Sequence, residues 1–163
     1  MRWWMLVGVL ASAPAMAGQV TKDDVAAAKD AWKEEVKEGK AIEKISKAWI
    51  KGYAKENQKK MHAADADLLE WRRKVLADLR DDGVSTKEVG VDGGAPAQQK
   101  LRDIVVELRD MQVRFDDETA PKGMYKKKQE LLQAAVAEMA VRADRYEKRY
   151  EKLKERLKAQ KKG

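Results

Sequence analysis

The sequence contains no cysteine, three prolines and a single phenylalanine, and aromatic residues occupy only 6% of its 163 positions. Without cysteine the chain has no disulfide, no thiolate metal ligand, no thiol nucleophile and no cysteine for a lipid anchor. Aromatic and β-branched residues are few beside Ala, Lys, Glu, Leu and Arg, which argues against a β-sandwich and for long helices. The length suits one domain. We therefore expect an all-α protein.

Residues 1–17 (MRWWMLVGVLASAPAMA) are the longest apolar run of the chain. A basic Arg2, an apolar stretch and a small-x-small ending at Ala17 are typical of a secretory signal peptide that is cleaved before Gly18. An uncleaved membrane anchor is the alternative, but a spanning helix needs about 20 apolar residues. We expect an exported protein, with the periplasm favoured over the extracellular space and residues 18–163 as its single helical domain.

Basic residues outnumber acidic ones by 35 to 28, and removal of residues 1–17 leaves 34 against 28, a net charge of +6. Outside the cytoplasm, anionic lipid, lipopolysaccharide, cell-wall polymers and acidic proteins replace nucleic acid as the expected polyanions. The segment 148–162 alone has a net charge of +6, so the rest of the mature chain is balanced. The candidate anion- or partner-binding residues are Lys148, Arg149, Lys152, Lys154, Arg156, Lys158, Lys161 and Lys162.

Apolar residues recur at steps of three and four through residues 22–80, which predicts helix. Thr21, followed by acids, is a predicted N-cap. Gly39 is expected to kink or break the helix. The apolar phase shifts before Met61, which predicts either a phase slip in one long helix or a short break near Asn57. Residues 81–97 contain four glycines and Pro96, so we expect a loop, and its length makes it either functional or disordered.

The second half of the chain predicts helices over 98–118 and 121–160, separated by a boundary at Thr119–Gly123. The last helix carries two series spaced by seven residues, which predict a coiled-coil seam. The series are Tyr125, Leu132, Met139, Tyr146 and Leu153, and Gln129, Val136, Ala143, Tyr150 and Leu157. We expect the region 41–80 to supply the partner in a long antiparallel hairpin, with or without self-association. A bent three- or four-helix arrangement is the alternative.

Residues for catalysis are scarce. His62 is the only histidine, and on one helix Ser46 would lie about 24 Å from it. His62 with Asp65 and Asp67 makes an incomplete metal site, and the segment from Gly90 to Gly94 lacks the order of a phosphate loop. We expect His62 to be a solvent-facing helical residue. We predict no enzyme, no catalytic residue, no cofactor and no metal site.

The aromatic stripes and the basic segment each have two interpretations. The aromatic side chains either pack in the core or line a groove that grips apolar segments of client proteins. These apolar contact candidates are Trp32, Trp49, Trp71, Tyr146 and Tyr150. The basic segment is either the charged end of a coiled coil or an amphipathic helix that lies on anionic membranes.

From these features we expect an exported, non-catalytic helical protein that binds or scaffolds envelope proteins. Its general character is similar to that of small basic periplasmic holding chaperones, although it has no motif of such a family. The alternative is a peripheral protein that binds anionic lipid or lipopolysaccharide through residues 142–163. A structural subunit of a larger complex, or self-association, is also open, because a coiled-coil seam serves each of these roles.

Overall fold

The computed structural model describes residues 18–80, 89–91, 93–109, 111 and 122–163. The expected signal peptide, most of the expected loop and most of the boundary at Thr119–Gly123 lie outside these residues. Within them the structure has four helices and no strand: α2 (Lys22–Ala54), α3 (Gln58–Arg80), α4 (Gly94–Arg109) and α5 (Lys122–Lys162). The expected all-α class is confirmed.

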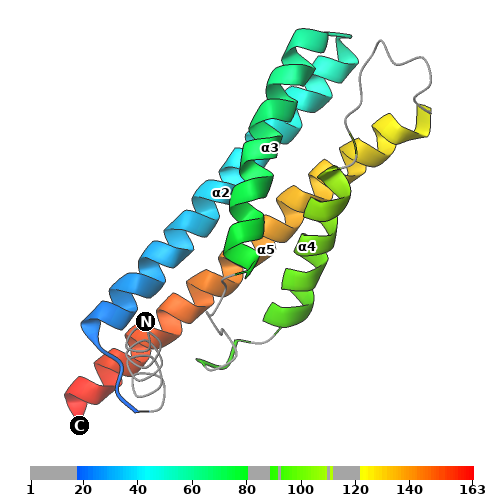
Figure 1. Ribbon diagram of the computed structural model, residues 1–163. Coiled ribbons are helices and arrows are strands. Elements are labelled where there is room, and N and C mark those ends of the chain that lie inside the picture. Colours follow the sequence, from blue (N-terminus) through cyan, green and yellow to red (C-terminus); the bar gives the residue numbers. More distant parts are fainter. Residues whose placement is uncertain (1–17, 81–88, 92, 110, 112–121) are drawn as a thin grey trace, which may run out of the picture.

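The helices alternate in direction along the chain (Figure 1). α2 and α3 form a local antiparallel hairpin, and α5 runs back along α2 so that the C-terminal end of α5 lies near the beginning of α2. α4 packs against α5 and α3. The expected partner region of the last helix, residues 41–80, is therefore only partly right, because α5 packs mainly on α2.

Thr21 begins α2 as predicted. Its hydroxyl accepts a hydrogen bond from the backbone N–H of Asp24 at 3.1 Å, and the Asp24 carboxylate accepts one from the backbone N–H of Thr21 at 2.8 Å. This capping box satisfies two backbone donors that the first turn would otherwise leave unpaired, a contribution of about 1 kcal/mol. α2 then continues through Gly39, where the expected break does not occur.

A short break, and not a phase slip, lies near Asn57. Glu56 has a φ of +50°, the Asn57 N–H donates to the carbonyl of Gly52 at 2.8 Å, and the Asn57 side chain accepts from the backbone of Lys60. At Gly52 an added Cβ would lie 3.0 Å from Met61 Cγ and 3.2 Å from Met61 N. Gly52 thus lets α3 begin close against α2. Because the chain reverses here, two antiparallel helices, α2 and α3, replace the first long helix of the favoured hairpin.

The main core lies between all four helices, and its apolar stripes are mostly those that the spacing predicts. It contains Ile42, Ile45, Trp49, Met61, Ala64, Leu68, Trp71, Val75, Leu79, Leu101, Ile104, Val105, Leu108, Leu132, Ala135 and Met139. A second, smaller cluster joins the beginning of α2 to the end of α5 through Val20, Ala28, Val89, Val91 and Leu153. Val89 and Val91 come from the expected loop, so this part of it has a packing role.

On α5 one predicted heptad series is buried except for its first member, Tyr125, which is half-buried, and the other series is half-buried throughout. Leu132, Met139, Tyr146 and Leu153 are buried, whereas Gln129, Val136, Ala143, Tyr150 and Leu157 are only half-buried. The second buried series is one residue earlier, at Lys128, Ala135 and Arg142. The seam was misplaced because two of these three residues are cations, which a hydrophobic pattern assigns to solvent. None of the described helices is long and apolar enough to cross a membrane.

Candidate functional site

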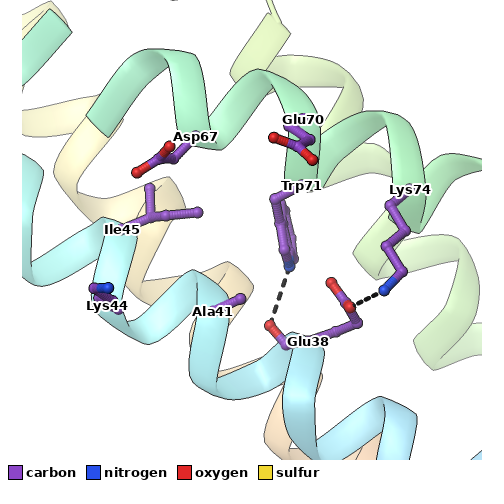
Figure 2. Close-up of a pocket in the computed structure, with 8 residues that line it drawn as sticks. All are labelled: Glu38, Ala41, Lys44, Ile45, Asp67, Glu70, Trp71 and Lys74. Carbon is purple, nitrogen blue, oxygen red and sulfur yellow. Dashed lines mark hydrogen bonds and ion pairs between the residues drawn. The ribbon is translucent and has the colours of Figure 1, made fainter. Parts of the chain in front are cut away.

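A groove of about 270 Å³ separates α2 from α3, and we call it the α2–α3 groove (Figure 2). Its apolar floor is made by Ala41, Ile45 and Trp71. Charges of both signs surround this floor, contributed by Glu38 and Lys44 of α2 and by Asp67, Glu70 and Lys74 of α3. A small apolar floor within a mixed polar rim is the composition of many binding sites.

Trp71 gives this groove a fixed floor. Its indole Nε1 donates a hydrogen bond to the backbone carbonyl of Glu38 at 3.1 Å, and only 3% of the residue is exposed. The Glu38 carboxylate holds the Lys74 ammonium, and this hydrogen bond is the main cause that raises the pKa of Lys74. The backbone carbonyl and the carboxylate of Glu38 each accept a hydrogen bond, and these two bonds fix the positions of the Trp71 indole and the Lys74 ammonium.

A second groove of about 350 Å³ runs between α2 and α5, and we call it the α2–α5 groove. Its apolar lining is Trp32, Val36, Gly39, Val136, Met139, Ala140 and Ala143. Its charged lining is mostly acidic, with Glu35, Glu43, Asp144 and Glu147 against Lys40. This groove lies over the half-buried heptad series of α5, because Val136 and Ala143 belong to both.

An aromatic pair lies where the α2–α5 groove meets the basic segment. Trp32 and Tyr150 stack with ring centroids 5.7 Å apart and an interplanar angle of 17°. The Lys154 ammonium lies 5.4 Å from the Tyr150 centroid, within the range of a cation–π interaction. Both rings are half-buried, so each keeps an edge in contact with solvent.

Buried cations are the feature that sequence reasoning missed. Arg142 donates from Nε to the Glu35 carboxylate at 2.9 Å and from a terminal nitrogen to the Tyr146 hydroxyl at 3.0 Å. Arg72 donates to the carbonyl of Val105 at 2.7 Å. The bonds of Arg142 to Glu35 and of Arg72 to Val105 join two helices each, whereas the bond of Arg142 to Tyr146 links successive turns of α5. No sequence signal distinguishes these arginines from the many exposed ones, because their partners lie far away along the chain.

Lys128 is the most deeply buried of these cations, with 1% of its side chain exposed. Its ammonium contacts the Asp65 carboxylate at 2.5 Å, the carbonyl of Met111 at 2.8 Å and the face of Trp49 at 5.0 Å. Burial lowers the pKa of Lys128, and the hydrogen bond to Asp65 opposes that change. The ammonium therefore joins α5 to α3 in the core.

The five apolar contact candidates fall into two groups. Trp49, Trp71 and Tyr146 are buried, with exposed fractions of 0%, 3% and 5%. Of these three, Trp71 also lines the α2–α3 groove. Trp32 and Tyr150 are the half-buried pair beside the α2–α5 groove. The structure does not bring the five aromatic side chains together into one surface.

The basic segment forms the last turns of α5. Lys148 pairs with Asp144 at 2.7 Å and Lys154 with Glu151 at 3.5 Å. Arg149 is partly buried, and its Nε has no hydrogen-bond partner among the described residues. The cations that are exposed and make no ion pair with the described residues are Lys152, Arg156, Lys158, Lys161 and Lys162. The apolar side of the same turns is turned inward, because Leu153 is 3% exposed.

The remaining candidates for chemistry are separate. His62 is exposed on α3, as expected for a solvent-facing helical residue, and Ser46 is buried on α2. Ser85 lies outside the described residues. Where the structure describes the chain, no three His, Asp or Glu side chains group closely enough to hold a metal ion. Comparisons with protein-family models, curated protein sequences and solved structures found no match to this chain.

Proposed function

We propose that this chain is an exported, non-catalytic helical protein that binds segments of other envelope proteins and thereby holds or scaffolds them. The observation that carries the proposal is the α2–α3 groove, whose apolar floor is fixed by the hydrogen bond from Trp71 to Glu38. Its location in the periplasm is proposed from residues 1–17 alone.

The groove suits a short apolar segment of varied sequence. One or two aliphatic or aromatic side chains would cover Ala41, Ile45 and Trp71, and burial of apolar surface contributes about 25 cal/mol per Å². The rim has cations and carboxylates, so polar groups that flank the apolar side chains find partners of either sign. We therefore expect broad and weak binding, as a holding or scaffolding role requires.

A substitution that fills the groove tests this proposal. Ala41→Phe places an aromatic ring in the groove, whereas Ala48→Phe makes the same change at an exposed position of α2 outside it. The assay is suppression of aggregation of an unfolded outer-membrane protein at stoichiometric ratios. We expect the original chain and the Ala48→Phe variant to suppress aggregation and Ala41→Phe to lose most of this effect. Absence of suppression by the original chain at a tenfold excess would refute the holding role.

A second candidate function is binding to anionic lipid or lipopolysaccharide. The observation that favours it is the cluster of exposed cations at the end of α5, which make no ion pair with the described residues. Because Tyr146 and Leu153 pack internally, such binding would be electrostatic and would not insert an apolar face.

Vesicle sedimentation separates the two functions. Electrostatic binding predicts that the chain sediments with anionic but not with neutral vesicles, and that high salt releases it. Lys161→Glu with Lys162→Glu should weaken this binding, whereas Lys59→Glu with Lys60→Glu, which changes the charge equally at the other end of the molecule, should not. Truncation after Val141 is unsuitable, because it removes buried Tyr146 and Leu153.

A further inference from the structure

α5 carries a heptad-spaced apolar series that the four helices cover only in part. Its apolar members Val136, Ala143, Tyr150 and Leu157 are half-buried. Val136 packs on the main core and Tyr150 and Leu157 on the second cluster, and the rest of each side chain faces solvent. The first two of these apolar members line the α2–α5 groove, and the last two lie within the basic segment. A series spaced by seven along one face of a helix is the surface on which a second helix packs in a coiled coil.

The charges around the α2–α5 groove favour a basic occupant. Glu35 is engaged with buried Arg142, but the other three acids lie at the exposed rim. Glu43 holds Lys47 and Asp144 holds Lys148 in exposed pairs, and such pairs contribute only about 0–1 kcal/mol, so they exchange readily. Glu147 makes no ion pair with the described residues.

The chain itself contains a segment of the required chemistry. The last turns of α5 combine half-buried Leu157 with exposed Lys158, Lys161 and Lys162. They hold the whole net positive charge of residues 18–163, because residues 148–162 carry +6. An apolar residue between cations complements an apolar floor between acids.

We propose that the α2–α5 groove binds the C-terminal turns of α5 from a second copy of this chain, in a reciprocal two-fold dimer. The two α5 helices run antiparallel, with the symmetry axis at the point between Tyr146 and Glu147. Val136 and Leu157 are equally far from this point along the sequence, and so are Ala143 and Tyr150. Large side chains of one copy therefore face small ones of the other, and both grooves are filled in a closed assembly.

The same register brings opposite charges together. α2 and α5 run antiparallel, so contacts that move up α2 move down α5. Glu35 pairs with Arg142, and Gly39 lies beside Met139. One turn after Gly39, Glu43 therefore lies next to Val136, and both line the α2–α5 groove. The turn that covers Val136 is the one that contains the partner's Leu157, which places Glu43 near the partner's Lys158 and the partner's Lys161. The α2–α3 groove takes no part in this contact, so the dimer and the proposed client binding can be tested independently, and failure of one does not refute the other.

Charge-reversal variants of the full mature chain test the dimer by analytical ultracentrifugation. We expect the original chain to form a dimer whose Kd rises with salt. Glu43→Lys changes the groove, and Lys158→Glu with Lys161→Glu changes the end of α5. Each variant should raise the Kd by more than about tenfold, because like charges across an interface are strongly unfavourable. An equimolar mixture of the two variants should restore the dimer, since reversed charges then face each other.

The control is Lys59→Glu with Lys60→Glu at the start of α3, which should leave the Kd unchanged, with circular dichroism and thermal unfolding to show that every variant is folded. A chain that stays monomeric at all accessible concentrations overturns the proposal. So does a dimer that both variants leave intact, because the contact then lies elsewhere. Failure of the mixture to restore a dimer that both variants weaken overturns the assignment of the C-terminal turns as the occupant.

Discussion

Arg142 of α5 and Glu35 of α2 form an ion pair 2.9 Å long, in which only 5% and 11% of the two side chains are exposed. The two residues are 107 positions apart in the sequence. Together with the Tyr146 hydroxyl, which accepts from the same guanidinium, they hold the two longest helices in one register.

Arg142→Met should destabilise the fold by about 3 kcal/mol, because it removes the buried hydrogen bonds of the guanidinium to the Glu35 carboxylate and the Tyr146 hydroxyl. The double variant Arg142→Met with Glu35→Leu should regain most of this loss, since a buried pair is often replaceable by apolar residues of similar volume. Urea unfolding measures both. If the double variant is as unstable as the single one, the loss comes from packing and not from the Arg142–Glu35 interaction.

Stability should depend on the titration of Lys128. Burial lowers its pKa in the folded state below the ordinary value of 10.5. Between the two pKa values the unfolded chain binds more protons than the folded one, so the free energy of unfolding rises with pH in this alkaline window. The free energy of unfolding of the original chain minus that of Lys128→Met should therefore increase as the pH approaches 10.5. A difference that is flat or falls contradicts a lowered pKa.

Two glycines in α2 should respond oppositely to alanine. At Gly39 a Cβ would be 3.7 Å from Met139 Cβ, an ordinary contact, so Gly39→Ala should stabilise the chain by about 0.5–1 kcal/mol through helix propensity. At Gly52 the Cβ would lie 3.2 Å from Met61 N and 3.0 Å from its Cγ. Gly52→Ala should therefore be destabilising, as the first turn of α3 must shift. Thermal unfolding of the two variants measures this contrast: Gly39→Ala should raise the Tm and Gly52→Ala should lower it. A change of Tm in the same direction for both would contradict the prediction.

Export should yield a chain that begins at Gly18. Mass spectrometry of the protein recovered from the periplasm measures the N-terminus. Ala17→Arg should block cleavage, because the position before the cut requires a small residue, whereas Ala11→Leu in the apolar stretch should be processed normally. A mature protein that retains residues 1–17 would favour the anchor.

Local sequence signals predicted much of the helical structure. The Thr21 cap, the position of the break near Asn57 and the buried series from Leu132 to Leu153 all follow from neighbours within a few residues. Such patterns do not determine whether the helix after a break continues in the same direction or reverses. The reversal at Asn57 depends on the close approach that Gly52 allows, which a spacing pattern does not contain.

The candidate grooves were less predictable than the helices. The α2–α3 groove exists because α3 folds back on α2, so its residues could not be grouped before the reversal was known. Lys128 and Arg142 look like surface residues until their distant partners, Asp65 and Glu35, are placed beside them. Val89 and Val91 lie outside the α-helices, as the predicted loop requires, but their burial in the second cluster was not predicted, because their glycine-rich neighbours dominate the local composition.

The second cluster has a consequence for the order in which the chain folds. Val20, just before α2, packs with Leu153 near the end of α5, and α2 has its main partner in this final helix. The α2–α3 hairpin can close as soon as both helices exist, but the rest of the apolar face of α2 stays uncovered until nearly the whole chain is present. On the export route proposed above, a polypeptide that passes a translocation pore from its N-terminus would therefore not complete its fold before nearly all of it has passed.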